Sequence, residues 1–115
     1  TLSVVTDQVG QPTSASDLAD QIVTLLDTFS GAGTFHGTNS GVTSWFEFAR
    51  AILEEIGEDP ERVLPTDSSS YVQLAPRPPY SVLGHERWAE VGMQPMRDWR
   101  AALSDVIDEI DSATL

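Results

Sequence analysis

The chain has 115 residues and a formal net charge of −12, which comes from 18 acidic and six basic side chains. This length allows one domain with a single core, and the hydrophobic fraction of 40% excludes the class of disordered acidic chains. All six basic residues are arginines. Nucleic acid is therefore not an expected partner, because phosphodiester backbones are bound by clusters of lysine and arginine.

The sequence contains no cysteine, which excludes a disulfide framework, a thiol nucleophile and a thiolate metal site. No apolar run approaches the roughly 18 residues that span a bilayer. We therefore expect no membrane contact and a soluble, cytoplasmic protein. The chain begins without methionine, inside a strand-like segment. This start predicts that residues 1–115 are a piece of a longer protein.

The first elements expected along the chain are a short strand and a helix. An apolar run at residues 4–5 predicts the strand, and a turn-rich segment follows over residues 7–13. The helix is expected to begin near Ser14 or Ser16, and Ser14 and Asp17 have the spacing of a capping box. Apolar side chains then recur at helical spacing, and the helix is expected to end by Gly31.

A second strand and a second helix are expected next. Residues 34–36 predict a short strand that runs into a polar turn over residues 37–41. Ser44 and Glu47 form a good capping box, and the apolar side chains that follow keep helical spacing. Gly57 supplies the expected end of this helix.

The second half of the chain predicts a strand at residues 63–64, a proline-rich loop over 68–79 and an extended segment at 80–83. A short helix over about 86–91 and a last helix from residue 98 follow. The fold class is α/β, with four helices and a few short strands. Strands this few and short cannot make a self-sufficient parallel sheet, so another part of the protein is expected to complete it.

Motifs for catalysis and for cofactor or metal binding are absent from the sequence. The Tyr-x-x-x-Lys pair of short-chain reductases cannot form, because Ala75 and Gly84 stand four places after the two tyrosines. The eight glycines form neither a dinucleotide fingerprint nor a phosphate-binding loop. His36 and His85 have no partner at the spacing of a zinc-binding helix. We expect no catalytic residue, no cofactor and no metal in this chain.

Three further features allow a structural and a functional interpretation. The turn at residues 37–41 lies between an expected strand and a capped helix, a layout that aims N–H groups at an anion but also serves simply to turn the chain. His36 is expected to be a hydrogen-bonded core histidine rather than a catalytic one. The acidic cluster at residues 54–61 is expected to be a solvated face.

Arg77 is the candidate ligand-binding residue that the pattern favours. It is the single charged residue between Ser68 and Gly84, and prolines flank it on both sides. A guanidinium held by a stiff loop suits a phosphate or pyrophosphate group. A surface ion pair with one of the many carboxylates is the alternative. Tyr71 and Tyr80 bracket the loop, placed either to stack on a sugar or base or to anchor the loop.

Four blocks of sequence, in one order, carry a resemblance to a known family. They are Asp-Gln-Val-Gly-Gln-Pro-Thr at residues 7–13, Phe-His-Gly at 35–37 with Thr-Ser-Trp-Phe-Glu-Phe-Ala at 43–49, Arg-Pro-Pro-Tyr-Ser-Val-Leu at 77–83, and Asp-Trp at 98–99. Over nearly its whole length, the chain resembles the C-terminal part of the dTDP-4-dehydrorhamnose reductase family. This family belongs to the extended short-chain dehydrogenase/reductases.

The resemblance implies that residues 1–115 are the substrate-binding portion of such a reductase. An N-terminal Rossmann half, absent from this chain, would be its partner and would hold NADPH and the catalytic Tyr/Lys pair. The whole protein would reduce dTDP-4-dehydro-L-rhamnose to dTDP-L-rhamnose, a precursor of cell-wall polysaccharide. Arg77 would meet the pyrophosphate of the dTDP-sugar, and Gln8, Thr13 and Tyr80 would be further substrate-binding residues.

The sequence also departs from the family pattern at several positions. Pro76 stands where the family often has a basic or small residue, and Gly84 and His85 replace a polar helix cap. Some relatives hold a divalent ion between glutamates at a dimer contact. Glu109 lies in the matching region, but Ser16 offers no carboxylate, so no metal is expected here.

Two other functions stay open on the sequence alone. The same scaffold serves as the regulatory, nucleotide-binding subunit of the methionine adenosyltransferase β type, and a stand-alone acidic interaction module would also fit the composition. Apolar stripes on the first two helices would lie uncovered without a second half of the protein. This feature allows association of copies into a homo-oligomer.

Overall fold

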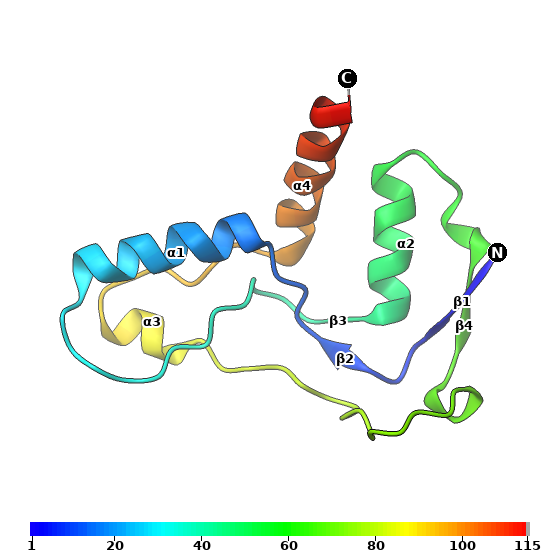
Figure 1. Ribbon diagram of the computed structural model, residues 1–115, viewed down its shortest axis with the longest axis horizontal. Coiled ribbons are helices and arrows are strands. Elements are labelled where there is room, and N and C mark those ends of the chain that lie inside the picture. Colours follow the sequence, from blue (N-terminus) through cyan, green and yellow to red (C-terminus); the bar gives the residue numbers. More distant parts are fainter. Residues whose placement is uncertain (115) are drawn as a thin grey trace.

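Two short strand pairs and four helices form the fold in the computed structural model, which describes residues 1–114 (Figure 1). Strand β1 (Leu2–Val5) pairs in parallel with β4 (Val63–Thr66), with Leu2 opposite Val63. Strand β2 (Val9–Gly10) pairs antiparallel with β3 (Thr43–Ser44). The strands expected at residues 4–5 and 63–64 are confirmed, each two residues longer than the sequence indicated.

Helix α1 (Ala15–Thr28) has the expected cap, because the Oγ of Ser14 accepts a hydrogen bond of 3.2 Å from the main-chain N–H of Asp17. None of its side chains is buried, and Ile22, Val23 and Leu26 are between 46% and 74% exposed. Its outward apolar face therefore lacks a covering layer within the part of the chain that the structure describes.

Helix α2 (Trp45–Glu55) begins after Ser44, whose Oγ accepts from the N–H of Glu47 at 3.1 Å. It packs against β1, β4 and helix α4 (Trp99–Thr114), so the parallel strand pair is covered on one side (Figure 1). Gly57 has a φ of 77°, which allows the chain to leave α2 as the sequence predicted. The capping boxes and the glycine stop thus placed both helices correctly.

The remaining elements are short. Helix α3 (Glu86–Glu90) is followed by Gly92 at a φ of 78°, and two 3₁₀ turns, η1 (Pro60–Arg62) and η2 (Ser68–Ser70), flank β4. The core is small and draws its side chains from α2, β4, α3, α4 and the segment that joins α3 to α4. Its buried apolar side chains are Ala51, Val63, Trp88, Met93, Met96, Ala102 and Leu103.

The strand expected at residues 34–36 is wrong. This segment is irregular: Phe35 packs on the ring of Trp88, and the carbonyl of His36 accepts a hydrogen bond of 3.1 Å from Trp88 Nε1. The expectation that His36 lies in the core is also wrong. Its side chain is exposed and contacts the carbonyl of Gly84 through Nδ1. The segment attaches to α3 through side chains, so it needs no strand partner.

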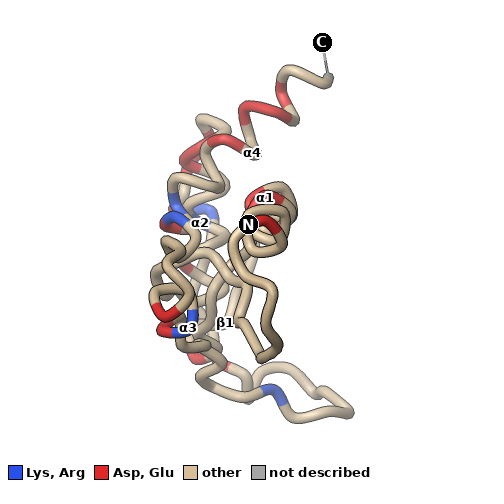
Figure 2. Tube along the Cα trace, turned by 90° about the vertical axis from the view of Figure 1, so that its left-hand side faces the viewer, with Lys and Arg blue, Asp and Glu red and all other residues tan. Residues whose placement is uncertain are grey.

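Residues 71–80, which we call the Arg77 loop, are exposed throughout. This part of the chain projects from one end of the molecule, whose principal extents are 48, 40 and 21 Å (Figure 2). The extended segment expected at residues 80–83 is present as a single bridge between Tyr80 and Val9. No helix within residues 1–114 is both long and apolar enough to cross a membrane.

Candidate substrate-binding site

A cavity of about 520 Å³ lies where three segments of the chain meet. The first is the turn-rich segment after β1, the second is β3 with the start of α2, and the third includes the end of the Arg77 loop. The lining residues are Gln8, Val9, Gly10, Gln11, Pro12, Thr13, Thr43, Ser44, Trp45, Phe48, Arg77, Pro78 and Ser81. A cavity of this size, with an apolar lining and a few polar groups, is typical of small-molecule sites.

The first two walls are joined through the main chain. Strands β2 and β3 pair, and the N–H of Trp45 donates to the carbonyl of Gln8 at 3.3 Å. A Cβ at Gly10 would lie 2.9 Å from the Oγ of Ser81, so a larger residue at position 10 would require the Ser81 side chain to move.

The third wall is bound to the first by two further main-chain contacts. The N–H of Val9 donates to the carbonyl of Pro79, and the N–H of Ser81 donates to the carbonyl of Val9, both at 2.9 Å. Three prolines around Arg77 restrict the φ angles of the loop. The sequence thus places a stiff loop end, with Arg77 on it, at the cavity.

Arg77 differs from the other arginines in its electrostatic partners. Five arginines form ion pairs: Arg50 with Glu61, Arg62 with Glu58, Arg87 with Glu90, Arg97 with Asp17 and Asp105, and Arg100 with Glu54 and Glu55. Arg77 has no ion pair within residues 1–114, although the chain carries a net charge of −12. Its guanidinium is therefore available to an anionic ligand, and the alternative of a surface ion pair is not what the structure has.

Three of the four residues predicted to bind substrate line this one cavity. They are Gln8, Thr13 and Arg77. Tyr80 is not among the lining residues, and its side chain is 64% exposed. Gln8 donates from Nε2 to the Oγ of Ser68 at 3.1 Å, and the hydroxyl of Thr13 donates to the carbonyl of Gln11 at 3.2 Å.

Trp45 is a site residue that sequence reasoning missed. Helical spacing groups it with the apolar side chains of the second helix, yet the residue is 56% exposed and lines the cavity together with Gln8. Its position directly after the capping serine was the available signal, because a first-turn side chain can face outward from the helix. An exposed indole at a cavity mouth is suited to stacking on a sugar or a base.

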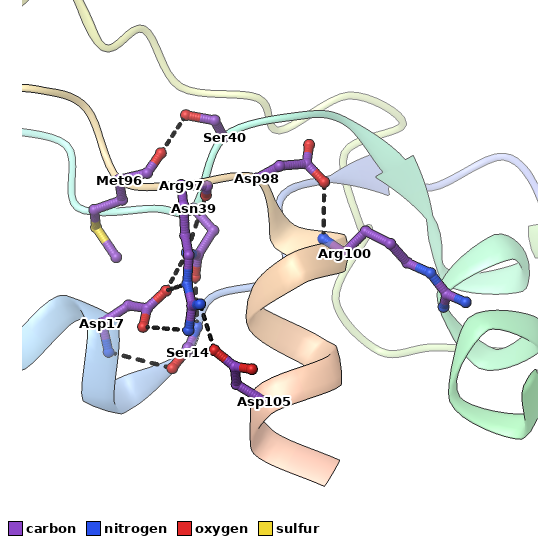
Figure 3. Close-up of polar contacts among 9 residues, drawn as sticks. All are labelled: Ser14, Asp17, Asn39, Ser40, Met96, Arg97, Asp98, Arg100 and Asp105. Carbon is purple, nitrogen blue, oxygen red and sulfur yellow. Dashed lines mark hydrogen bonds and ion pairs between the residues drawn. The ribbon is translucent and has the colours of Figure 1, made fainter. Parts of the chain in front are cut away.

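A polar cluster behind the cavity fixes the turn at residues 37–41 (Figure 3). Asn39 is 0% exposed: its Oδ1 accepts from the N–H of Ser14 at 2.7 Å, and its Nδ2 donates to Asp17 at 2.8 Å and to the carbonyl of Arg97 at 3.1 Å. The N–H of Ser40 donates to the same carbonyl at 2.9 Å. These internal contacts favour the structural interpretation of this turn over anion binding.

The carboxylate of Asp17 is central to this cluster. Hydrogen bonds from Arg97, at 2.8 and 3.1 Å, hold the pKa of Asp17 below its ordinary value, and Asn39 lowers it further. The pKa of Arg97 is correspondingly raised, chiefly by Asp17 and then by Asp105. The pair thus joins α1 to the segment before α4.

The free energy of unfolding is expected to fall as the pH is lowered, because Asp17 in this cluster becomes protonated. A carboxylate whose pKa is lowered by folding stabilises the protein above its unfolded pKa of about 4, and this stabilisation is lost as pH falls through the folded pKa. The Asp17→Asn variant should therefore lose less stability than the wild type between neutral pH and acid. Urea unfolding across this range is the measurement, and parallel losses in both proteins would contradict it. The pKa of Asp7 is also lowered, by Ser68, and this effect is common to both proteins.

Metal-binding residues do not gather in the described chain. Residues 1–114 contain no group of three or more histidine, aspartate or glutamate side chains placed to hold an ion.

Solved structures share the fold of this chain. A dTDP-4-dehydrorhamnose reductase from Clostridium acetobutylicum superposes with a TM-score of 0.89 and 37% identity, over 96% of this chain and 39% of that one. The same enzyme from Bacillus anthracis, solved in complex with NADP, superposes with a TM-score of 0.87 and 37% identity, over 94% of this chain and 38% of that one. The fold is thus that of a portion of an extended short-chain reductase.

The sequence comparisons identify the portion. Residues 1–112 match the RmlD substrate binding domain, and the chain belongs to this family. A dTDP-4-dehydrorhamnose reductase of Mycolicibacterium smegmatis is 44% identical over 98% of this chain. A probable dTDP-4,6-dihydroxy-2-methyloxan-3-one 4-ketoreductase of Streptomyces antibioticus is 43% identical over 97% of it. The chain spans 35% and 38% of the lengths of these two relatives. The expected family is therefore confirmed.

Proposed function

We propose that this chain is the substrate-binding portion of a reductase that converts dTDP-4-dehydro-L-rhamnose to dTDP-L-rhamnose. Family membership and the names of the relatives support this proposal. The names favour a reductase over the regulatory subunit and the stand-alone module. The single observation that carries the role of this chain is that Arg77, which has no ion pair within residues 1–114, lines a cavity of about 520 Å³.

The cavity offers complementary groups to each part of a sugar nucleotide. Arg77 is placed to bind the pyrophosphate through charge-assisted, two-pronged hydrogen bonds. Trp45 and Phe48 give aromatic surface for the sugar or the base. Gln8, Thr13 and Ser44 add polar groups along the lining. Tyr80 is placed at the edge of the loop, and its stacking role stays a prediction.

The reaction itself is assigned to the rest of the protein. NADPH, when bound, would supply the hydride that reduces the C4 ketone of the sugar. An N-terminal Rossmann half is proposed to hold this cofactor and the Tyr/Lys pair, because the chain contains neither a glycine fingerprint nor a lysine. The function of residues 1–115 is to bind and orient the dTDP-sugar.

Two calorimetric titrations test this division of roles. The full-length protein is expected to bind dTDP and to oxidise NADPH when dTDP-4-dehydro-L-rhamnose is added. Residues 1–115 alone are expected not to bind NADPH at micromolar concentration. If the isolated chain bound NADPH with micromolar affinity, our assignment of the cofactor site to the N-terminal half would be wrong. Absence of turnover with the dTDP-sugar, in a folded protein that binds NADPH, would contradict the substrate assignment.

A further inference from the structure

The Arg77 loop has few contacts of its own. All ten of its residues are exposed, and within residues 1–114 no hydrogen bond joins residues 72–78 to the rest of the chain. The nearest contact before this stretch is the hydroxyl of Tyr71, which donates to the carbonyl of Ser3 at 2.9 Å. The position of Arg77 therefore depends on how the two ends of the loop are attached.

Both ends are also attached to the first wall of the cavity by glutamine side chains, in addition to the main-chain hydrogen bonds that join Val9 to Pro79 and to Ser81. Before the loop, Gln8 donates to the Oγ of Ser68 at 3.1 Å. After the loop, Gln11 makes a two-way contact with the backbone of Leu83: its Oε1 accepts from the N–H at 2.8 Å, and its Nε2 donates to the carbonyl at 3.4 Å. The first wall thus spans the base of the loop.

The attachment of Ser68 by Gln8 and that of Leu83 by Gln11 differ in whether another residue also holds the same point of the chain. Ser68 is also held by Asp7, whose carboxylate accepts from its N–H at 3.1 Å and from its hydroxyl at 2.8 Å. Loss of Gln8 would therefore leave Ser68 anchored. Leu83 has no second hydrogen-bonding partner within residues 1–114, so its attachment depends on Gln11.

We propose that Gln11 is a positioning residue for Arg77, holding the loop so that the guanidinium stays at the cavity before the ligand arrives. This inference rests on the proposed function, in which Arg77 binds the phosphates of the sugar nucleotide. Both polar atoms of the Gln11 side chain, Oε1 and Nε2, are hydrogen-bonded to Leu83. Gln11 therefore affects ligand binding indirectly, by holding the loop that carries Arg77. A loop ordered in advance loses less conformational entropy on binding, which increases affinity.

A double-mutant cycle in the full-length protein tests the inference. Loss of the two contacts to Leu83 in Gln11→Ala is expected to weaken dTDP binding about 3- to 10-fold. In the Arg77→Ala background the same change is expected to add nothing, because the group that Gln11 positions is gone. The KM for the dTDP-sugar should rise accordingly while kcat stays the same. Gln21→Ala is the matched control, since Gln21 also donates to a backbone carbonyl, that of Gln94, away from the cavity.

A second variant and a second measurement separate positioning from packing. Gln11→Met keeps the length of the side chain and removes both hydrogen bonds, so it should behave like Gln11→Ala. Amide hydrogen exchange of residues 80–83 in the ligand-free protein should become faster in Gln11→Met, above all at Leu83, whose N–H donates to Gln11. Unchanged exchange, or wild-type affinity of this variant, would overturn the inference.

The outcomes also distinguish the inference from the proposed function. If Arg77→Ala binds dTDP as tightly as the wild type, the phosphate role of Arg77 is wrong. If Arg77→Ala binds weakly and Gln11→Ala weakens binding further by the same factor in both backgrounds, the phosphate role stands and the positioning role of Gln11 is wrong. If the two effects are not additive and exchange is faster in Gln11→Met, both stand.

Discussion

Replacement of Arg77 by alanine in the full-length protein is expected to weaken binding of a dTDP-sugar roughly 10- to 150-fold, because a charge-assisted contact to phosphate is worth about 1.5 to 3 kcal/mol. The effect should be large because Arg77 lines the cavity and has no carboxylate partner within residues 1–114. The guanidinium does not have to leave an ion pair before it binds the ligand. Calorimetric titration with dTDP and the KM for the dTDP-sugar are the measurements.

Two further variants define the contribution of the guanidinium. Arg77→Lys keeps the charge and loses the two-pronged geometry, so it should recover part of the affinity. Arg62→Ala is the matched control: Arg62 is exposed, pairs with Glu58 at 2.9 Å and does not line the cavity. An unchanged KM in both Arg77 variants would show that the pyrophosphate lies elsewhere.

The helices could be predicted from the sequence because their signals are local. Ser14 and Ser44 cap α1 and α2 as their spacing to Asp17 and Glu47 indicated. These contacts link residues three positions apart, and the apolar spacing that follows is equally local. Local patterns of this kind fixed both starts to within one residue.

The parts that were mispredicted depend on contacts between distant residues. Residues 34–36 have the composition of a strand, but Phe35 and His36 attach to Trp88, more than fifty positions later in the sequence. The cluster around Asn39 joins it to Ser14 and Arg97, which lie 25 and 58 positions away. No single-sequence pattern specifies such partners.

In the candidate site, too, the features with a local sequence signal could be predicted and those that depend on distant residues could not. Arg77 could be selected because its flanking prolines and the absence of neighbouring charges are visible in the sequence. The attachment of Gln11 to Leu83 spans 72 positions and was not foreseen. Trp45 was misjudged because helical spacing alone does not tell which side chain of a first turn faces a cavity. Sequence therefore indicated the ligand-binding group, and structure was needed for the residues that position it.

Loss of the Asn39 side chain should destabilise the fold strongly. It is fully buried, and its three hydrogen bonds join the start of α1, the turn at residues 37–41 and the segment before α4 (Figure 3). Ser14, whose N–H donates to Asn39, is the N-cap of α1 and directly follows residues 8–13, which line the cavity. A side chain without polar atoms at position 39 leaves this donor and part of the Asp17 carboxylate without their partner.

The Asn39→Ala variant is expected to lose roughly 3 kcal/mol of unfolding free energy, because buried polar groups that lose their partner are not compensated by water. Thr24→Ala is the matched control: its hydroxyl makes one exposed contact within α1, to the carbonyl of Asp20 at 3.0 Å, and the change should stay within about 0.5 kcal/mol. Urea unfolding of the three proteins at neutral pH is the measurement. Asn39→Asp should also be destabilised at neutral pH, because it sets a second carboxylate beside Asp17, and it should recover part of this loss as the pH is lowered and one of the two is protonated. An Asn39→Ala variant as stable as Thr24→Ala would show that the turn at residues 37–41 is held by its main-chain contacts to Arg97 and Trp99 alone.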